Sequence, residues 1–574
     1  MTKMTSSEAM VETLRMEGVE TMPGIVGSAF MDALDLLPAA GIRFLPVRHE
    51  QTAAHMADAM SRITGKAAVC IGQNGPGITN MVTSVAAAYH AHSPMLVITP
   101  AATTSSVGLD GFQEIEQLSI FRSVTKFQIE VPRPDRMAET FRTAFREAYA
   151  RLGPVQVNIP RDYFYGDSDV EILEPHQYRA SSRPEPTRDQ IEQAVLLLEQ
   201  ASSPVILAGA GVQDAHEAVA RLAEKLAAPV ATTYLHNDAF TADHDLYAGP
   251  IGYMGSKAAM NLLSEADVVL AIGSRLNVFG KVPQYGKDFF PKSATIIQVD
   301  IDPGQIGRST PVEVGIVADA GVTAAALADR LEAVDEAEAS ARRARVKAAQ
   351  QSWKAELAEL SGSDAVPIDP RRALQEISGA LPQDAIVTTD VGNICSTANG
   401  YLGFSQPRTF LPALGFGNCG FAYPAALGAK LVRPDRPVVA LIGDGAWGMS
   451  LHEVMTAVEE DLPVVAVVLN NQQWGAEKRN QVDFYADRFV GVDIGRDLGG
   501  FDFAAIATAM GADGQRIEKP AELSEAIRSA SEAGRPTVLE VMVDPELLAE
   551  PFRRDALQPP KRFLERYRHL NHEA

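Results

Sequence analysis

The chain has 574 residues, which is too long for one compact core and favours three or four domains at roughly 150 residues each. With 46% hydrophobic and 22% charged residues it has the composition of a globular protein. Its net charge of -22 disfavours nucleic acid and anionic membranes as partners, since like charges repel. Three cysteines exclude a disulfide framework. Together with the lack of a signal peptide or a long apolar run, they predict a cytoplasmic protein.

Short β-branched runs alternate with helical periods along the chain, the pattern of α/β domains with mainly parallel sheets flanked by helices. Two polar stretches interrupt this pattern: Glu174–Thr187, which holds three prolines, and a charged segment from Ala333 to Pro367. We therefore expect three domains, at residues 1–175, 188–335 and 368–574.

The buried strands predicted from apolar, β-branched runs fall into the same three groups. In chain order they are Arg43–Val47, Ala67–Gly72, Met95–Thr99 and Val155–Ile159; Val205–Ala208, Val268–Ile272 and Thr295–Val299; and Ile386–Thr389, Val438–Ile442, Val464–Leu469 and Thr537–Val543.

The third group carries the strongest chemical signal. Its second strand runs into Gly443-Asp444-Gly445, a helix is expected over Met449–Glu460, and the next strand ends in Asn470-Asn471. A right-handed crossover makes the two strands parallel, so Asp444 and Asn471 meet at one edge of the sheet. Carboxylate, amide and main-chain carbonyl oxygens there suit Mg²⁺. A tight turn followed by an unrelated Asn pair is the alternative.

This spacing, GDG followed by 24 residues and NN, resembles the motif of the thiamine diphosphate-dependent decarboxylases and acetohydroxyacid synthases. The resemblance implies thiamine diphosphate and Mg²⁺ as cofactors. The metal ligands would be Asp444, Asn471 and the main-chain carbonyl of Gln473, and the N–H groups of Gly445 and Ala446 would approach the diphosphate.

Glu50 follows the first predicted strand and opens the helical stretch Gln51–Thr64, where this family keeps its catalytic glutamate. A carboxyl group there bonds N1′ of the aminopyrimidine and favours the imino tautomer that removes the C2 proton of the thiazolium. The alternative is a glutamate that merely stabilises a helix N-terminus. The loop Gln73–Asn80 matches the family's GPG turn, with Gly75 close to the pyrimidine.

Two further stretches of the third group resemble cofactor contacts of the family. In Gly417–Pro424 the carbonyl of Gly417 would receive the 4′-amino group, and Cys419 would support the bent cofactor where relatives usually carry Met, Leu or Ile. A packing cysteine is the alternative. Asn393 would donate to the diphosphate. Synthases have Gln-His-Gln where this chain has Asn393-Ile394-Cys395, so one histidine contact is missing.

Nearly end to end the chain resembles the sulfoacetaldehyde acetyltransferases, above all in residues 470–480 and 550–557. That resemblance implies conversion of sulfoacetaldehyde and phosphate into acetyl phosphate and sulfite through a 2-acetyl-thiamine diphosphate intermediate. The alternatives are an acetolactate synthase-like enzyme or other 2-oxo acid decarboxylase or ligase, and a noncatalytic paralogue that binds thiamine diphosphate.

Both expected substrates are small anions, which need fixed cations and donors. From Pro551 to Ala574 there are six Lys or Arg against three acids, in a chain of net charge -22. We hypothesise that Arg553 or Arg554, with Lys478 and Arg479, binds sulfonate or phosphate. A basic tail paired with an acidic body is the alternative.

Other side chains are weaker candidates for the site. Gln113 is expected to face the reacting centre. Proton transfer is conceivable for three histidines of the first domain, although a lone histidine is more often structural. These histidines are His49, His55 and His92.

The middle domain has Gly209-Ala210-Gly211 after a strand but lacks the third glycine of a dinucleotide fingerprint, so FAD is not expected. The family resemblance also implies that Glu50 of one subunit reaches cofactor held by the third domain of another. A homodimer or homotetramer with active sites at subunit interfaces follows.

Overall fold

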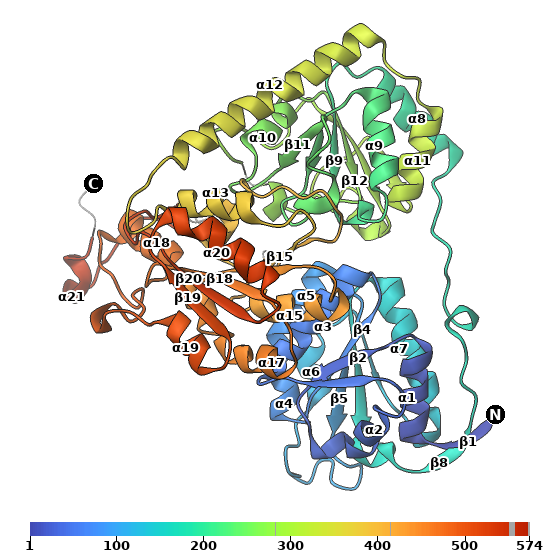
Figure 1. Ribbon diagram of the computed structural model, residues 1–574. Helices are drawn as coiled ribbons and strands as arrows, with labels where there is room; N and C mark the ends of the chain where they lie inside the picture. The colour runs from blue at the N-terminus through green and yellow to red at the C-terminus, as the bar shows by residue number, and fades with distance from the viewer. Residues whose placement is uncertain (282, 414, 550–556, 572–574) are drawn as a thin grey trace.

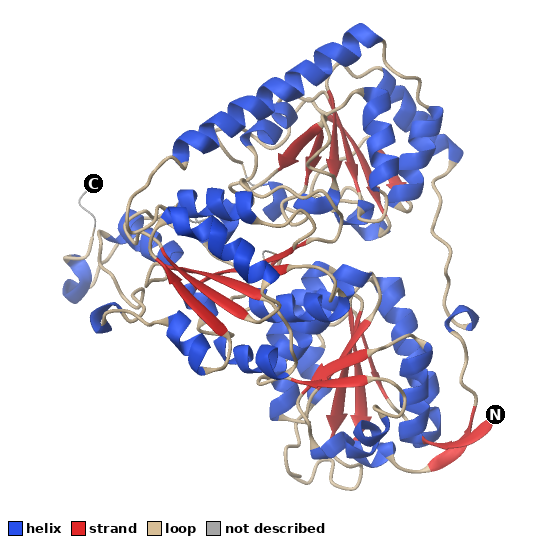
Figure 2. Cartoon of the chain, in the orientation of Figure 1, coloured by secondary structure: helices blue, strands red, loops and turns tan. Residues whose placement is uncertain are grey.

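The structure, a computed structural model, describes residues 1–281, 283–413, 415–549 and 557–571. In this part of the chain three six-stranded sheets, each with parallel strand pairs throughout, lie between helices (Figure 2). The predicted fold class is therefore confirmed. Each predicted strand is present within one or two residues of its expected bounds.

The first sheet has the order β3-β2-β4-β5-β7-β6, and a separate antiparallel pair joins β1 to β8. The strands are β1 (Thr2–Thr5), β2 (Thr21–Gly24), β3 (Arg43–Pro46), β4 (Ala68–Ile71), β5 (Met95–Ala101), β6 (Phe127–Glu130), β7 (Pro154–Pro160) and β8 (Asp167–Val170). The helices are α1 (Ser6–Met16), α2 (Met31–Leu36), α3 (Glu50–Thr64), α4 (Pro76–Thr79), α5 (Val82–Ala91), α6 (Gln117–Phe121) and α7 (Met137–Arg151).

The middle sheet has the order β11-β10-β9-β12-β13-β14. Its strands are β9 (Pro204–Ala208), β10 (Val230–Thr232), β11 (Tyr247–Pro250), β12 (Val268–Ile272), β13 (Thr295–Asp300) and β14 (Val314–Val317). Its helices are α8 (Arg188–Glu199), α9 (His216–Leu226), α10 (Lys257–Ser264) and α11 (Ala320–Arg330).

The third sheet has the order β16-β15-β17-β18-β20-β19. Its strands are β15 (Ile386–Thr389), β16 (Phe410–Pro412), β17 (Val438–Gly443), β18 (Val465–Asn470), β19 (Asp513–Ile517) and β20 (Thr537–Met542). The helices are α13 (Pro370–Ala380), α14 (Asn393–Ala398), α15 (Ala422–Val432), α16 (Asp444–Trp447), α17 (Val454–Glu459), α18 (Gly475–Tyr485), α19 (Phe503–Ala509), α20 (Pro520–Glu532) and α21 (Glu565–Arg568).

The two polar stretches connect the sheets in different ways. Residues 178–187 are extended and run along one side of the molecule from the region of β8, near the N-terminus, to α8 (Figure 1). The charged stretch forms α12 (Glu336–Leu360), a single helix along the outer edge of the middle domain. Among the helices of the described residues, none is long and apolar enough to cross a membrane.

The helix expected over Met449–Glu460 is present in a shorter form. It starts as a 3-10 turn, η9, at Leu451–Glu453 and continues directly as α17, Val454–Glu459. The side chains of Ser450 and Glu453, three residues apart at the start of this stretch, are almost fully shielded from solvent.

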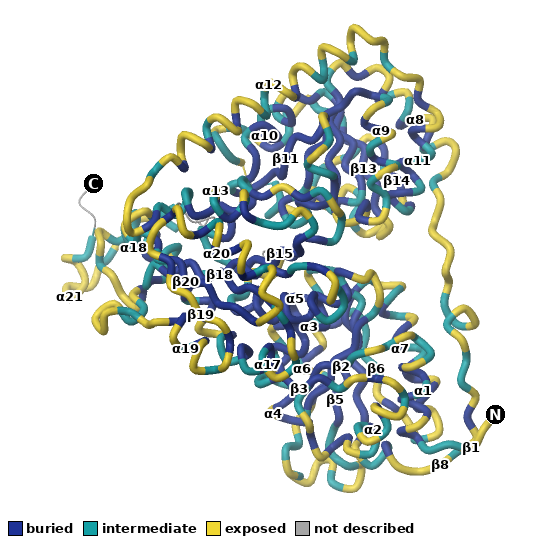
Figure 3. Tube along the Cα trace, in the orientation of Figure 1, coloured by how far each residue is buried: buried dark blue, intermediate teal, exposed yellow. Residues whose placement is uncertain are grey.

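The first and third domains share a hydrophobic core, centred on the packing of α3 against α15. A Cβ atom at Gly428 of α15 would lie 2.5 Å from the carbonyl oxygen of Met56 in α3, so only glycine allows this approach. The His55 ring packs edge-on against Phe421, with centroids 5.2 Å apart. Figure 3 colours most of α3 as buried. The two domains of one chain are therefore held in fixed contact.

Candidate active site

The end of β17 and the end of β18 meet as predicted. The two strands pair in parallel with Gly443 opposite Leu469, which brings the next residues of both strands to one edge. The Asp444 carboxylate, only 3% exposed, accepts hydrogen bonds from the N–H groups of Gly445 (3.0 Å) and Gln473 (3.2 Å). The GDG motif is thus joined to the loop that follows the NN motif.

The electrostatics of Asp444 suit a cation. Burial raises the pKa of its carboxyl group to about 7, although main-chain hydrogen bonds oppose the shift. None of the ion pairs between described residues involves Asp444. A divalent ion would compensate the buried charge, and the nearby Asn471 side chain and loop carbonyls are the hard oxygen ligands that Mg²⁺ prefers. No cluster of three or more His, Cys, Asp or Glu that could hold a metal occurs in the described residues, so the amide and carbonyl oxygens would be essential.

The loop after β18 is braced by its own side chains. Gln473 donates to the Pro545 carbonyl and accepts a 2.7 Å hydrogen bond from the ammonium group of Lys478. The Gln473 side chain is thus held by contacts within the protein. A Cβ atom at Gly445 would lie 2.8 Å from the Trp474 ring, which explains the glycine there.

The predicted substrate cations have partners already. Lys478 is 5% exposed and also pairs with Asp493 at 3.4 Å. Arg479 donates to Asp483 at 3.0 Å and to the Leu548 carbonyl at 3.4 Å. Lys478 is therefore buried beneath the loop, whereas Arg479 is partly exposed at its surface. Arg553 and Arg554 fall outside the described residues.

The loop at Gly417–Ala422 is organised by a residue that the sequence did not single out. The buried carboxylate of Asp390 accepts hydrogen bonds from the N–H groups of Gly420 (3.1 Å) and Ala422 (2.9 Å). Gly417 has a positive φ of 80° and is exposed. Cys419 is half-buried, and burial, followed by the charges of Asp390 and Glu477, raises the pKa of its thiol to about 12.

Asn393 begins α14, where its amide group donates to the Ala549 carbonyl at 2.6 Å. Its Oδ1 atom is buried without a hydrogen-bond partner among the described residues. The amide donor predicted for the diphosphate is therefore bonded within the chain in this structure.

Glu50 begins α3 as predicted and is 8% exposed. Its carboxylate accepts a 2.9 Å hydrogen bond from Asn80, which closes the QNGPGITN loop. A Cβ atom at Gly77 would lie 3.1 Å from Oε1 of Glu50, so the small residue leaves room beside the carboxylate. Gly75 has a positive φ of 68°, as its place in the turn requires.

Gln113 closes the other side of this loop. Its Oε1 accepts from Gln73 at 2.9 Å and its main-chain carbonyl accepts from Asn74 at 3.2 Å. Gln113 is itself in the left-handed region with φ of 59°. The structure thus places Gln113 and the GPG turn together, next to Glu50.

The two halves of the predicted site lie apart within one chain. Figure 1 shows α4, next to Glu50, at the lower part of the molecule and α18, which follows the NN motif, at the far end of the third domain beside α21.

The three histidine candidates are spread over separate contacts. His49 caps α3 by accepting from the Gln51 N–H group at 3.2 Å. His55 is fully buried against Asn418, and burial lowers its pKa to about 3. His92 contacts Arg275 of the middle domain, and burial again lowers its pKa to about 3. The neutral rings of His55 and His92 suit structural roles.

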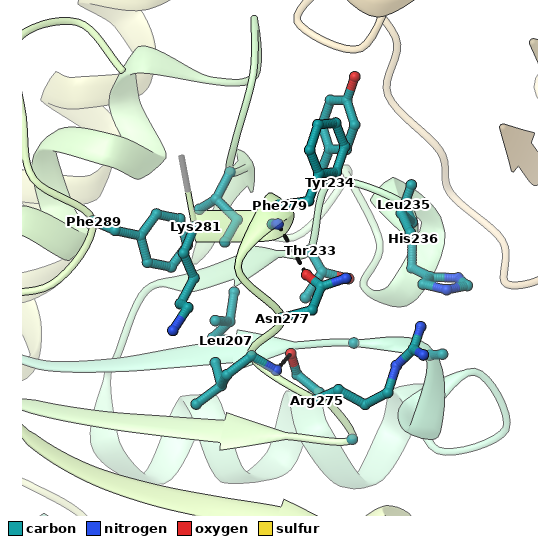
Figure 4. A pocket seen from close by; sticks show the side chains of 17 residues that line it. Leu207, Thr233, Tyr234, Leu235, His236, Arg275, Asn277, Phe279, Lys281 and Phe289 are labelled. Atoms are coloured by element: carbon teal, nitrogen blue, oxygen red, sulfur yellow. Dashed lines mark hydrogen bonds between the residues drawn. The ribbon is translucent and has the colours of Figure 1, made fainter. Parts of the chain in front are cut away.

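A cavity of 60 Å³ lies in the middle domain, at the carboxyl ends of β9, β10 and β12. Figure 4 shows Arg275, Asn277 and Lys281 among its lining side chains. Both cations have partners: Lys281 donates to the Ser309 carbonyl at 2.9 Å and Arg275 to the His90 carbonyl at 3.2 Å. The volume accommodates only a few water molecules.

Comparison with protein families identifies this architecture. Residues 4–120 match the N-terminal binding domain of thiamine pyrophosphate enzymes, residues 191–327 their central domain and residues 390–541 their C-terminal binding domain. The chain belongs to the thiamine pyrophosphate enzyme family. The Glu50 loop thus lies in the N-terminal binding domain of the family and Asp444 in the C-terminal one.

Within this family, the chain shares nearly half of its residues with two acetyltransferases. It is 47% identical to a sulfoacetaldehyde acetyltransferase of Castellaniella defragrans and 48% identical to one of Alcaligenes xylosoxydans xylosoxydans, each over 99% of this chain and 97% of the relative. A probable acetolactate synthase large subunit of Methanocaldococcus jannaschii is 34% identical over 94% of this chain and 92% of its own.

A solved structure has the same fold. The thiamine diphosphate-dependent 4-hydroxybenzoylformate decarboxylase of Rhodococcus jostii RHA1 superposes with a TM-score of 0.81 over 94% of this chain and 99% of its own, at 24% identity. At that identity the likeness concerns the fold alone.

Proposed function

We propose that this thiamine pyrophosphate enzyme converts sulfoacetaldehyde and phosphate into acetyl phosphate and sulfite. The observation that carries the proposal is the near full-length identity of 47–48% with enzymes of that name, against 34% with the acetolactate synthase relative. The overall reaction balances without an oxidant, because sulfite leaves with the electron pair of the C–S bond. We propose a cytoplasmic location, which three free cysteines support.

The residues of the two halves of the site would bind different parts of the cofactor. Asp444, Asn471 and the Gln473 carbonyl would hold Mg²⁺, and Gly445 and Ala446 would present N–H groups to the diphosphate. When bound, thiamine diphosphate supplies a C2 carbanion that adds to aldehydes.

Glu50 would hold a proton at the aminopyrimidine ring, with Gly75 and Gly77 leaving space for it. Gly417 would offer its carbonyl to the same ring, while Cys419 would support it as a neutral, apolar side chain. Asn393 would serve the diphosphate after exchanging its Ala549 contact. Gln113, Lys478, Arg479, Arg553 and Arg554 remain our candidates for substrate contacts.

Because the two halves are apart in one chain, we propose a homodimer or homotetramer whose active sites lie between subunits. We further propose domain limits of 1–175, 188–335 and 368–574, with the middle domain as a scaffold that holds no FAD.

One assay tests the function. Purified protein with thiamine diphosphate, Mg²⁺ and phosphate should release sulfite and acetyl phosphate in equal amounts from sulfoacetaldehyde. Omitting phosphate should abolish acetyl phosphate formation. Carbon dioxide release from pyruvate, with no sulfite from sulfoacetaldehyde, would refute the proposal and favour the synthase activity.

A further inference from the structure

Glu453 is a fully buried carboxylate that the proposed chemistry does not use. It ends η9 in the third domain, nine residues after Asp444 in the chain. Burial of a carboxylate is costly unless strong donors surround it. Burial would raise the pKa of Glu453, but hydrogen bonds from His452, Thr456 and Thr52 outweigh burial and lower it. The carboxylate is thus stabilised in its charged form.

The main donors come from the turn that precedes Glu50. Oε1 of Glu453 accepts from the N–H groups of Arg48 (3.1 Å) and His49 (3.0 Å), and Oε2 accepts from the Thr456 hydroxyl at 2.5 Å. His49 in turn caps α3, whose first residue is Glu50. A carboxylate of the third domain therefore fixes the backbone that carries the catalytic glutamate of the first.

Other contacts hold the same segment. Arg48 pairs with Glu459, and Arg43 pairs with Glu460 at 2.5 Å. The rings of His49 and His452 lie 6.1 Å apart, edge to face. The stretch from β3 to α3 is thus anchored on η9 and α17, and the two backbone N–H groups on Glu453 are its buried anchor.

Consecutive turns connect this anchor to the metal loop. The Gly448 N–H group donates to the Asp444 carbonyl (3.1 Å), Ser450 to Trp447 (2.9 Å) and Glu453 to Ser450 (3.0 Å). A short, hydrogen-bonded piece of backbone therefore runs from the Mg²⁺ segment to the carboxylate that holds the Glu50 turn.

We propose that Glu453 is a positioning residue that orients Glu50 and ties it to the metal-binding segment of the same chain. The inference rests on the proposed role of Glu50. Since Glu50 would serve cofactor bound by another subunit, Glu453 lies between the metal segment of one site and the glutamate of the next. Occupancy of one site can thereby affect the geometry of its neighbour.

Glutamine cannot replace Glu453 without cost. Several donors point at the carboxylate, among them the N–H groups of Arg48 and His49 and the Thr456 hydroxyl, and an amide would bring two N–H bonds of its own toward them. Thr456→Val is milder, because it removes one donor and leaves the charge.

The test compares Glu453→Gln and Thr456→Val with the parent and with Glu522→Gln, a control at an exposed acid of α20. In the full-length protein without cofactor, amide hydrogen exchange of residues 46–52 should quicken at least about tenfold in Glu453→Gln, and less in Thr456→Val. With saturating thiamine diphosphate and Mg²⁺, exchange of the cofactor C2 proton should slow by about 10–100-fold in Glu453→Gln. Cofactor affinity should change less than about threefold, and the control should match the parent.

A parent-like rate of C2 proton exchange in Glu453→Gln would overturn the proposal. If that variant does not fold, Thr456→Val decides: parent-like exchange in both measurements overturns it. Glu50→Gln is measured in parallel. If Glu50→Gln also leaves C2 exchange unchanged, the role of Glu50 fails, whereas slow exchange in Glu50→Gln alone refutes only the role of Glu453.

Discussion

The main-chain N–H group of Gln473 donates to the Asp444 carboxylate at 3.2 Å, which ties the loop after β18 to the end of β17. One side chain thereby organises both motifs of the diphosphate half of the site. The Asp444 carboxylate has no ion-pair partner among the described residues. Replacing Asp444 should therefore affect Mg²⁺ binding and the stability of the metal-free protein separately.

Asp444→Asn should weaken Mg²⁺ binding in the presence of thiamine diphosphate by at least about tenfold, because the ligand charge is lost. The metal-free variant should melt at the same or a higher temperature than the parent, since burial already raises the pKa of Asp444 to about 7. Calorimetric titration and thermal unfolding measure the two effects. Asp497→Asn, at an exposed acid, is the control. Unchanged Mg²⁺ affinity would contradict the metal site.

A substitution at Lys478 tests whether this residue supports the metal loop or binds substrate. Its ammonium group donates to Gln473, so Lys478→Met should loosen the metal loop and raise the Mg²⁺ concentration needed for half-maximal activity by about three- to tenfold. The KM values for phosphate and sulfoacetaldehyde should change less. The opposite pattern, a raised KM for an anion with an unchanged Mg²⁺ requirement, would place Lys478 in the substrate site.

Hybrid dimers test where the halves meet. In a dimer of one Glu50→Gln chain and one Asp444→Asn chain, a site between subunits is intact once and damaged once. Each variant alone should be nearly inactive, while co-expressed hybrids purified through two different tags should regain about half of the parent activity, one of two sites. Hybrids as inactive as either variant would show that the site lies within one chain.

Buried histidines should make the fold sensitive to acid. Burial, aided by nearby arginines, lowers the pKa values of His55, His92 and His236 to about 3. Between pH 6.5 and 3 the unfolded chain binds protons that the folded chain does not, so stability falls as the pH falls below 6.5. Each histidine contributes about 1.4 kcal/mol per pH unit in that window.

His55→Gln should therefore lose less stability than the parent between pH 7 and pH 5 in thermal unfolding. His176→Gln, at an exposed histidine, should behave as the parent does. An equal loss in His55→Gln and the parent would mean that His55 takes up a proton in the folded protein.

The cysteines should be inert in the folded protein. Burial raises the pKa values of Cys70 and Cys419 to about 12 and also raises that of Cys395. At pH 8 a thiol with such a pKa is ionised on the order of one part in 10⁴, so iodoacetamide should label the native protein far more slowly than the unfolded protein. Mass spectrometry of labelled peptides counts the sites. Rapid labelling of Cys419 in the native protein would identify it as a reactive thiol.

The sequence was sufficient for buried strands formed by apolar, β-branched runs such as Val268–Ile272. It missed short buried strands such as β10 and β11, which have three and four residues, and also β19, an edge strand that is polar and mostly exposed. The helix predicted at Met449–Glu460 is present over Leu451–Glu459, but the contacts of its Glu453 with Arg48 and His49 were not predicted. Glu453 lies about four hundred residues from Arg48 and His49 in the chain, so no local sequence pattern predicts this contact.

The close contact between Gly428 and Met56 has a consequence for the history of such chains. If recombination replaced the first domain, the new α3 would have to pack against the existing α15. A single added methyl group at this helix crossing would clash and prevent the two helices from packing. Productive exchange would require α3 and α15 to be inherited together, although more than three hundred and fifty residues separate them. The middle domain, which lies between them in the chain, is under no such constraint from this helix crossing.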